Sequence, residues 1–476
     1  MKKVGKYITL TLLLLLGLCC VGILYLFFLP NSSLFNITYI GKSSEHISKQ
    51  YSINSVNKIN LNSRKYDVNI LSTKETDIYV EVFSNPFGFV LTKNKDLEIS
   101  STLSNNILTF DIKEPHGAAI INDSYINLYI PTTKSIDLSL TNYKAKTTIN
   151  SSDLVINHLS YSTHNGDLHF EKGEIAQAID LNLGKSTFTI SNAVKTHSND
   201  LNLSLTTGKL NATNCEFGNV AILANARGVI NLGNCESLTE NIGAAGGRIN
   251  ANRLSHINVK TTDTIISVNE VTDGAIVELT KSGSISINTL SGVSAFTTSS
   301  GNINLGLTKS SLTATTDDGN INISKAMYKI SAKTNYGNIN INFAEDAASY
   351  KDNNNARAIT ATLKKGKLTV NGVENINITV TDSASINVNM KNVFGENLID
   401  GKNGNVKVVV NKDSQYVLKT LSSNGTVRVN LTQTTECFGY TTKEERLTNV
   451  NCSTSQNILN ITTNYGNLLV LDTNFA

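Results

Sequence analysis

An exact repeat of 18 residues in the second half of the chain constrains the fold more than any other feature. Each repeat begins with a glycine followed by alternating polar and aliphatic residues, and these glycines are Gly283, Gly301, Gly319 and Gly337. Alternation with a period of two is typical of a β-strand that buries one face. Eighteen residues accommodate two short strands and two turns, which make one coil of a parallel solenoid. Because the 3.6-residue period of a helix is missing, the repeat predicts stacked β-coils.

Weaker copies of the same pattern extend from Gly166 to Gly466. The sequence therefore predicts an all-β fold, a parallel β-solenoid (β-helix) of about 15 coils of about 18–20 residues over residues 141–476. Residues 56–140 are also rich in β-forming segments but less regular. We expect them to form an irregular β region that caps the solenoid at its N-terminal end, because terminal repeats must shield the stack from water. Residues 30–55 are expected to be a polar linker.

Composition narrows the class of protein further. Charged residues make up 17% of the chain and the formal net charge is +3, which argues against nucleic acid as a partner. The chain contains only 4 prolines, which argues against a flexible stalk or a Pro-rich linker. Asn, Ser, Thr and Ile recur throughout, which favours strands joined by polar turns.

The N-terminal residues predict a membrane anchor. No charged residue occurs between Ile8 and Leu29, and lysines at positions 2, 3 and 6 precede this stretch. A helix of this length spans about 33 Å, enough for a hydrocarbon core of about 30 Å. We therefore expect a transmembrane helix over residues 7–29 and a cytoplasmic tail over residues 1–6, since lysines stay on the cytoplasmic side. The rest of the chain is then extracytoplasmic.

Two alternatives to a retained anchor stay open. The apolar stretch could be a cleaved signal peptide, although no small-x-small cleavage site follows it. It could also be a lipoprotein signal, because it contains Cys19 and Cys20. Leu18 precedes the first of these cysteines, where lipidation prefers a small residue. A retained single-pass anchor is therefore favoured.

Four cysteines beyond the anchor are candidates for two disulfides. Cys215 and Cys235 share an Asn-Cys-Glu context and are 20 residues apart, which is one local coil. Adjacent coils bring side chains to about 5 Å, so we expect a disulfide outside the cytoplasm, with two buried free thiols as the alternative. Cys437 and Cys452 flank a charged stretch that interrupts the coil rhythm, and we expect a second disulfide there.

No pattern of residues predicts catalysis, a metal or a cofactor. Four histidines fall in one region, at His158, His164, His169 and His197, but their spacing fits neither one strand face nor a coil repeat. Asp317 and Asp318 precede a repeat glycine and could suggest polysaccharide cleavage. The equivalent positions of neighbouring coils hold Ser299 and Asn335, so we interpret the aspartates as turn residues. We expect no enzymatic activity, no metal and no cofactor.

Repeated asparagines form the candidate binding surface. One column contains Asn302, Asn320 and Asn338, and a second contains Asn304, Asn322 and Asn340. Such a comb of amides could bind sugars or another strand, or it could simply stabilise the coils by stacking. The loop from Phe343 to Arg357 breaks the period by eleven residues and is either a recognition loop or a tolerated insertion.

Several segments of the chain resemble those of a known family. The resemblance lies in the Gly-Asn-Ile-Asn-Ile units together with the segments Ile126-Asn127-Leu128-Tyr129-Ile130-Pro131 and Ile136-Asp137-Leu138-Ser139-Leu140. They resemble the adhesin β-repeat proteins, a domain family of unknown function related to the heads of autotransporter adhesins. The resemblance covers nearly everything after residue 56. It implies a bacterial envelope location and supplies no catalytic residues.

These observations predict a non-enzymatic, adhesin-like protein anchored in the bacterial cytoplasmic membrane, with its solenoid on the extracytoplasmic side. The expected partners are a glycan, peptidoglycan or another envelope protein. Two alternatives remain: a self-assembling envelope scaffold, and an envelope-stress regulatory ectodomain. A cytoplasmic tail of six residues has no room for an output domain, so the regulator would have to act through a membrane partner.

Overall fold

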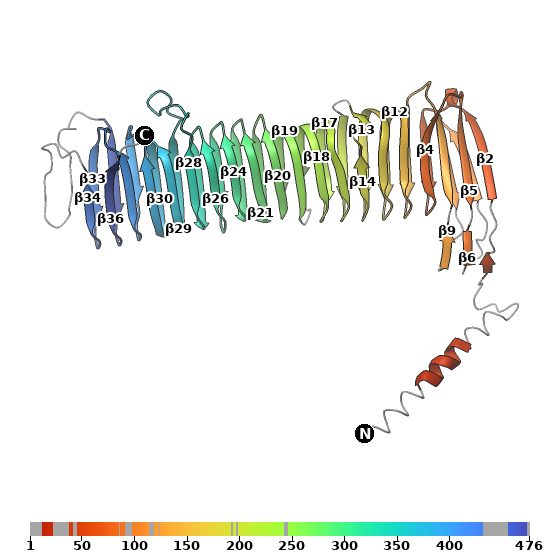
Figure 1. Ribbon diagram of the computed structural model, residues 1–476, viewed down its shortest axis with the longest axis horizontal. Coiled ribbons are helices and arrows are strands. Elements are labelled where there is room, and N and C mark those ends of the chain that lie inside the picture. Colours follow the sequence, from red (N-terminus) through yellow and green to blue (C-terminus); the bar gives the residue numbers. More distant parts are fainter. Residues whose placement is uncertain are drawn as a thin grey trace. The chain divides into compact units, whose positions relative to one another are not determined.

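The computed structural model of the chain describes residues 12–21, 38–40, 45–84, 86–90, 98–113, 119–122, 124–191, 194–196, 199–241, 246–431 and 456–473. Nearly all of these residues lie in β-strands (Figure 1). The chain forms two compact units, residues 1–155 and residues 156–476. Each unit is described by itself.

Unit 2 is a parallel β-solenoid, which confirms the predicted fold class, although the stack has about 13 coils in the described residues rather than the expected 15. Each coil contributes a strand to a first ladder and a strand to a second ladder. In the regular region the first ladder contains β20 (Thr264–Val271), β22 (Ser284–Leu290), β24 (Ile303–Thr308), β26 (Ile321–Ala326) and β28 (Ile339–Phe343). The second ladder contains β21 (Ala275–Ser282), β23 (Ser294–Ser300), β25 (Leu312–Thr316) and β27 (Ile330–Tyr336).

Several strands of unit 2 are long enough to run through both ladders. They are β13 (Leu168–Leu183), β17 (Lys209–Asn225), β18 (Val229–Asn241), β19 (Gly247–Thr261), β29 (Ala358–Val373) and β30 (Asn375–Met390). The remaining strands are β14 (Thr187–Ile190), β15 (Val194–Thr196), β16 (Asn199–Leu205), β31 (Glu396–Asp400), β32 (Val406–Asn411), β33 (Val417–Ser422), β34 (Val427–Asn430), β35 (Ile458–Thr463) and β36 (Leu468–Thr473).

Strand register reproduces the sequence repeat. Ile285 pairs with Ile303, which pairs with Ile321, so one coil is one 18-residue repeat. These isoleucines are fully buried. A buried aliphatic side chain of this size contributes about 1.5–3 kcal/mol, so the stacked isoleucines are a main source of stability.

The repeat glycines lie at the corner where the second ladder passes into the first ladder. A Cβ atom built on Gly301 would overlap the carbonyl oxygen of Gly283, and one built on Gly319 would overlap the carbonyl oxygen of Gly301. Any side chain at these positions would therefore force adjacent coils apart. Steric contact between backbones explains why glycine recurs in every regular coil.

At the C-terminal end, the order of the coils in space differs from their order in the chain. Val406 of β32 pairs with Leu468 of β36, and Leu468 also pairs with Val427 of β34. In the second ladder, β35 likewise pairs with both β31 and β33. The coil formed by β35 and β36 therefore lies between two coils that precede it in the sequence (Figure 1).

Unit 1 combines parallel coils with antiparallel strands. Its larger sheet contains β2 (Glu45–Ser52), β3 (Lys58–Ser63), β4 (Asp67–Thr73), β5 (Asp77–Ser84), β7 (Glu98–Ser104), β8 (Ile107–Lys113), β10 (Tyr125–Pro131), β11 (Ile136–Asn142) and the start of β12 (Thr147–Thr163). A second sheet contains β1 (Thr38–Ile40), β6 (Pro86–Val90) and β9 (Ala119–Asn122), which are antiparallel.

Within the larger sheet of unit 1, β3 lies between β8 and β11, and all three are parallel. Three pairs of the described strands are antiparallel: β2 pairs with β5, β5 pairs with β10, and β7 pairs with β8. The turn between β7 and β8 has positive φ at Asn105 and Asn106, at 51° and 62°, which is the geometry of a type I′ hairpin. Antiparallel strands thus interrupt the parallel stacking in this unit.

Ordered structure begins before residue 56. The strand β2 and a 3-10 helix, η1 (Ile53–Ser55), fall within the stretch expected to be a linker. Tyr51 of β2 contacts the ring of Phe110 edge-on, with the ring centroids 5.5 Å apart, and its hydroxyl donates to Ser101 Oγ. These contacts with β7 and β8 attach β2 to the sheet. The polar composition of residues 30–55, on which the expected linker was based, does not indicate this strand.

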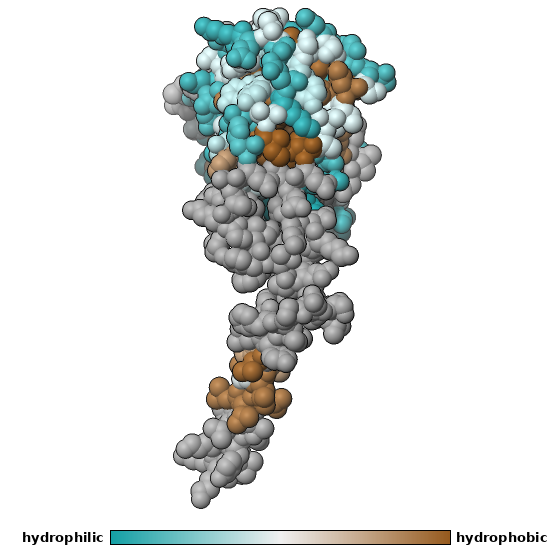
Figure 2. Space-filling model, turned by 90° about the vertical axis from the view of Figure 1, so that its right-hand side faces the viewer, coloured by the Kyte–Doolittle hydropathy of each residue, from teal (hydrophilic) through white to brown (hydrophobic). Residues whose placement is uncertain are grey.

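The expected transmembrane helix over residues 7–29 is described only over residues 12–21, which are helical. Its leucines, such as Leu12 and Leu16, are more than half exposed, and Figure 2 shows the helix in brown for its apolar residues. Among the described residues, no helix has both the length and the hydropathy needed to cross a bilayer. The remainder of 7–29 and the tail at 1–6 lie outside the described residues, so the anchor stays a prediction.

Candidate binding surface

From Asn211 onward, strand register aligns ten uncharged polar residues on the outer face of the first ladder, and Thr189 precedes Asn211 in the same register. We call these ten residues the amide column: Asn211, Asn231, Asn250, Ser267, Ser286, Asn304, Asn322, Asn340, Thr369 and Asn387. Successive members lie one coil apart, about 4.8 Å. The next position in the same register is Lys407, where the uncharged run ends.

The predicted asparagines Asn304, Asn322 and Asn340 all belong to the amide column. Sequence analysis missed Asn211, Asn231 and Asn250, because the coils there are 19 or 20 residues long rather than 18. A usable signal exists in the sequence. Each of these asparagines is the third residue after a repeat glycine, as Asn304 is after Gly301.

Hydrogen bonds connect neighbours within the amide column. Asn250 Nδ2 donates to Asn231 Oδ1 at 2.8 Å, and Asn231 Nδ2 donates to Asn211 Oδ1 at 2.8 Å. Asn322 Nδ2 donates to Asn304 Oδ1 at 2.9 Å. A side-chain amide has two N–H donors and an oxygen with two lone pairs, and each such bond uses one of each. The column therefore has hydrogen-bonding capacity beyond its internal ladder.

The other predicted column, which contains Asn302, Asn320 and Asn338, has a structural role. Asn302 Oδ1 accepts the backbone N–H of Asn320 at 2.9 Å, and Asn320 Oδ1 accepts that of Asn338 at 2.9 Å. These side chains thus satisfy backbone groups at the turns, as asparagine commonly does. At these three positions the stacked amides therefore stabilise the coils, which is the structural interpretation given above.

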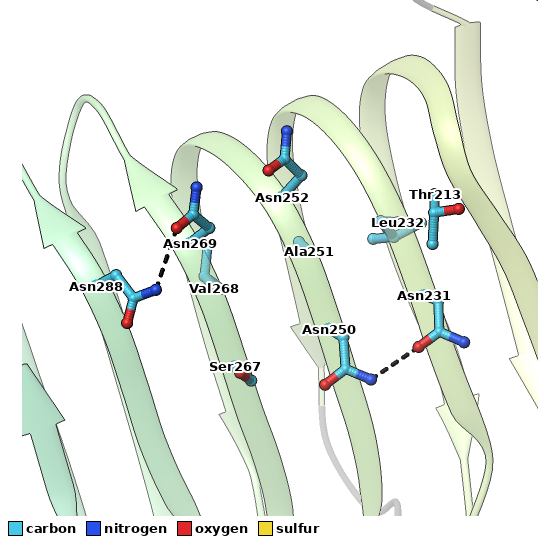
Figure 3. A pocket seen from close by; sticks show the side chains of 10 residues that line it. All are labelled: Thr213, Asn231, Leu232, Asn250, Ala251, Asn252, Ser267, Val268, Asn269 and Asn288. Carbon is cyan, nitrogen blue, oxygen red and sulfur yellow. Dashed lines mark hydrogen bonds between the residues drawn. The ribbon is translucent and has the colours of Figure 1, made fainter.

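A shallow trough of about 290 Å³ adjoins the amide column where the first ladder bends toward the second (Figure 3). It is lined by Thr213, Asn231, Leu232, Asn250, Ala251, Asn252, Ser267, Val268, Asn269 and Asn288. Leu232, Ala251 and Val268 are buried and provide an apolar floor. Asn252, Asn269 and Asn288 are exposed on the side opposite Asn231 and Asn250 (Figure 3). The trough therefore has amides on both sides of an apolar strip.

The loop at residues 344–357 is fixed by a buried ion pair. Arg357 is 2% exposed, and its Nε lies 3.8 Å from Glu374 Oε1. The guanidinium also donates to three carbonyl oxygens, those of Ala347 at 3.1 Å, Gly372 at 3.0 Å and Glu345 at 2.6 Å. Burial lowers the pKa of Arg357, and the carboxylate of Glu374 opposes this shift.

Glu374 holds the other side of this loop. Its Oε2 accepts hydrogen bonds from Ser349 Oγ and from the backbone N–H of Tyr350, both at 2.7 Å. Arg357 has a φ of 47°, a conformation that costs about 1–3 kcal/mol for a residue other than glycine. The insertion is thus a specifically built loop, which Figure 1 shows beside β28.

The structure contains Cys215 and Cys235 as free, buried thiols rather than as the expected disulfide. The register pairs Cys235 with Phe217, because β17 has an irregularity between Ala212 and Glu216. Burial raises the pKa of Cys215 to about 11 and that of Cys235 to about 12. Cys437 and Cys452 lie outside the described residues, so their disulfide stays a prediction.

The histidines and aspartates singled out in the sequence do not converge. His158 Nε2 lies 2.7 Å from Asp180 Oδ2 on the next coil, and Asp317 Oδ1 accepts from Asn335 Nδ2 at 2.8 Å. Within the described part of the chain, no three His, Cys, Asp or Glu side chains gather as a metal site would require. His197 is outside that part.

Solved structures that resemble this chain come from bacteria. One, from Clostridium sporogenes and provisionally named a cell adhesion protein, is 10% identical over 90% of this chain and 100% of its own, with a TM-score of 0.18. A provisionally named adhesin from Bacteroides fragilis is 12% identical over 73% and 99%, with a TM-score of 0.17. Another from Parabacteroides distasonis is 11% identical over 74% and 100%, with a TM-score of 0.20.

TM-scores this low do not by themselves establish a common overall fold. No curated protein sequence matches the chain significantly. Comparison with protein-family models gives a match: residues 56–371 match the family described as Toastrack DUF4097. This match confirms the resemblance to an adhesin-like domain family of unknown function. Because the match covers well over half of the sequence, this chain belongs to the Toastrack DUF4097 family.

Proposed function

We propose that this chain is a non-enzymatic, adhesin-like protein of the bacterial envelope that binds an uncharged glycan along its amide column and trough. The observation that carries the proposal is the uninterrupted run of ten uncharged polar positions between Asn211 and Asn387. A charged ligand would gain little from this surface. A neutral polymer rich in hydroxyl groups matches it, because amides and hydroxyls both donate and accept hydrogen bonds.

The trough supports the same ligand class. Sugar rings have an apolar face and a polar edge, which suit the strip formed by Leu232, Ala251 and Val268 and the asparagines beside it. Each exposed hydrogen bond contributes only about 0.5–1.5 kcal/mol, because it replaces a bond to water. Affinity would therefore come from many contacts along one polymer, and a repeating protein surface provides them.

The N-terminal helix and the loop at 344–357 complete the proposal. The uncharged stretch from Ile8 to Leu29 and the lysines before it support an anchor in the cytoplasmic membrane with the solenoid outside. The loop, held by Arg357 and Glu374, supports contact with a second envelope protein, because ordered insertions in repeat proteins commonly recognise partners.

The proposal is tested by screening the full chain, purified in a neutral detergent, against a glycan array and isolated peptidoglycan. The trough variant N252A/N269A/N288A should lose binding, because these exposed amides form one side of the trough. A matched control, N354A/N377A/N424A, replaces three exposed asparagines elsewhere and should bind normally. Equal binding by both variants would argue against the trough as the site.

A second candidate function is self-assembly into an envelope scaffold. Within the described residues, β33 pairs only with β35 and β34 pairs only with β36, so this coil has one side open to further pairing. Open strand edges are sites where chains associate. Light scattering on the same sample distinguishes the candidates, because concentration-dependent assembly without glycan binding would favour the scaffold.

A further inference from the structure

A row of lysines and tyrosines, all exposed except the half-buried Lys364, follows the corner between the two ladders in the C-terminal coils. We call it the lysine ridge, and its members are Tyr336, Lys364, Lys365, Lys367, Lys402 and Tyr465. Tyr336 pairs with Lys365, which pairs with Ser383 on the next coil. Bridges from Ser383 to Lys402 and from Asn403 to Tyr465 continue the row. The ridge therefore crosses consecutive coils of the stack.

The 18-residue repeat does not account for the lysine at position 367. In the preceding coils, the position of Lys367 is occupied by Asn302, Asn320 and Asn338, each at the same turn. Lys367 retains the backbone hydrogen bond, because its N–H donates to Asn338 Oδ1 at 3.0 Å. This hydrogen bond uses the backbone of Lys367 alone, so it leaves the charged side chain available for other contacts.

Two of the lysines are held in place by neighbouring groups. Lys364 Nζ donates to the hydroxyl of Tyr336 at 2.9 Å and lies 5.1 Å from the centre of its ring. The hydrogen bond with Tyr336 raises the pKa of Lys364, so this charge persists at alkaline pH. Lys402 Nζ donates to the carbonyl oxygen of Thr381 at 2.6 Å. Charges fixed in this way lose less conformational freedom when they bind a ligand.

The spacing of the charges favours a linear ligand. Lys365 and Lys402 are two coils apart, about 9.6 Å along the stack, which is comparable to the length of a disaccharide. Between them lies one acidic group, Asp382, whose Oδ2 is 3.5 Å from Lys365 Nζ. Tyr336 and Tyr465 are 48% and 62% exposed, so rings capable of stacking on sugars lie beyond both ends of the lysines.

We propose that the lysine ridge binds a linear anionic polysaccharide that runs parallel to the stack axis. Its acidic groups contact Lys364, Lys365 and Lys402, and its sugar rings pack against the two tyrosines. The ridge lies on other coils than the trough, so this site and the proposed neutral-glycan site can fail independently.

Binding of fluorescent polygalacturonate to the full chain in neutral detergent, measured by anisotropy over a range of salt concentrations, tests the proposal. The variant K364Q/K365Q/K402Q should bind about tenfold more weakly at low salt, and its salt slope should fall by about one unit per lysine. D382N should bind more tightly than the unmodified chain, because it removes the one acidic side chain between the lysines.

The matched control is K325Q/K329Q/K391Q, which removes three exposed lysines at the opposite corner of the coils. It should change the affinity less than about twofold. Thermal melting monitored by circular dichroism establishes that all variants fold, since every substituted side chain is on the surface. Equal weakening by the control would overturn the proposal, because binding would then reflect net charge alone.

Further probes separate a polysaccharide from other polyanions. Neutral dextran should not bind the ridge, and single-stranded DNA and phosphatidylglycerol vesicles should bind more weakly than polygalacturonate. Tighter binding of the DNA or the vesicles, with the same loss in the ridge variant, would overturn the assignment to a polysaccharide. Failure of polygalacturonate to bind at low salt would overturn it as well.

Discussion

Gly319 stacks directly on Gly301, so closely that a Cβ atom at position 319 would overlap the carbonyl oxygen of Gly301. The same relationship joins Gly301 to Gly283 and Gly337 to Gly319. One missing methyl group per coil thus determines how closely the backbones approach at this corner.

We expect Gly319→Ala to destabilise the solenoid by about 1–3 kcal/mol, the usual cost of an added group in a fully packed site. The matched control is Ser300→Ala, at an exposed position of the same corner, which should change stability by less than about 0.5 kcal/mol. Urea denaturation followed by circular dichroism measures both. A Gly319→Ala midpoint equal to that of the unmodified chain would show that the corner can relax.

Removal of one partner of the buried pair in the 344–357 loop should have a larger effect. Glu374→Ala leaves the Arg357 charge buried without its ion-pair partner, which costs about 3–5 kcal/mol. Backbone amides of the loop should then exchange hydrogen faster, because Ser349 and Tyr350 lose their acceptor.

The control for this prediction is an exposed ion pair. Lys260 Nζ lies 2.9 Å from Glu278 Oε2, and both side chains are about half exposed. Glu278→Ala should cost less than about 1 kcal/mol, because solvent screens such pairs. Similar losses for the two variants would mean that the loop does not depend on its buried pair.

Glu240 should make stability depend on pH. Its side chain is 1% exposed, and burial raises its pKa to about 7 from an ordinary value of 4.5. The folded state therefore keeps the proton after the unfolded chain has released it. This contribution to stability is fully present below about pH 4.5 and is lost as pH rises to about 7.

Glu240→Gln removes the titrating group, so the variant should gain stability relative to the unmodified chain as pH increases. The relative gain between about pH 4 and pH 8 should be about 3 kcal/mol, the equivalent of the shift in pKa. Unfolding midpoints across this range measure it. A difference that does not change with pH would show that Glu240 titrates normally.

Cys215 and Cys235 should react with a thiol reagent only after unfolding. Their pKa values, raised to about 11 and 12 by burial, leave almost no thiolate at neutral pH. The measurement uses a variant in which the other four cysteines are replaced by serine. Two thiols should appear in denaturant without a reductant. If none appears, the pair is oxidised, as the sequence spacing suggested.

Much of the fold follows from the sequence because the repeat reports local geometry. Gly301 and Ile303 predict a turn, a strand and a buried face, and each of these is in the structure. The order of the coils in space cannot be derived from the repeat in this way. Val406, Leu468 and Val427 have equivalent places in their coils, so the periodicity does not say which of them are neighbours.

The sequence predicted only those members of the amide column that lie in coils of the common 18-residue length. Asn304 stood out because its coil has the common length, whereas Asn231 and Asn250 occur where coil length varies. The buried charges at Arg357 and Glu374 were not predicted. They are 17 residues apart in an irregular segment, and no period relates them.

The position of the last coil has a consequence for biosynthesis. The strands β35 and β36 emerge after the coil of β31 and β32 and the coil of β33 and β34, yet they lie between these two coils. Assembly that follows the ribosome coil by coil therefore cannot finish the stack, since the coil of β33 and β34 has no adjacent partner until residues 458–473 arrive. A chain that terminates before residue 458 therefore lacks the coil that joins β33 and β34 to the rest of the stack.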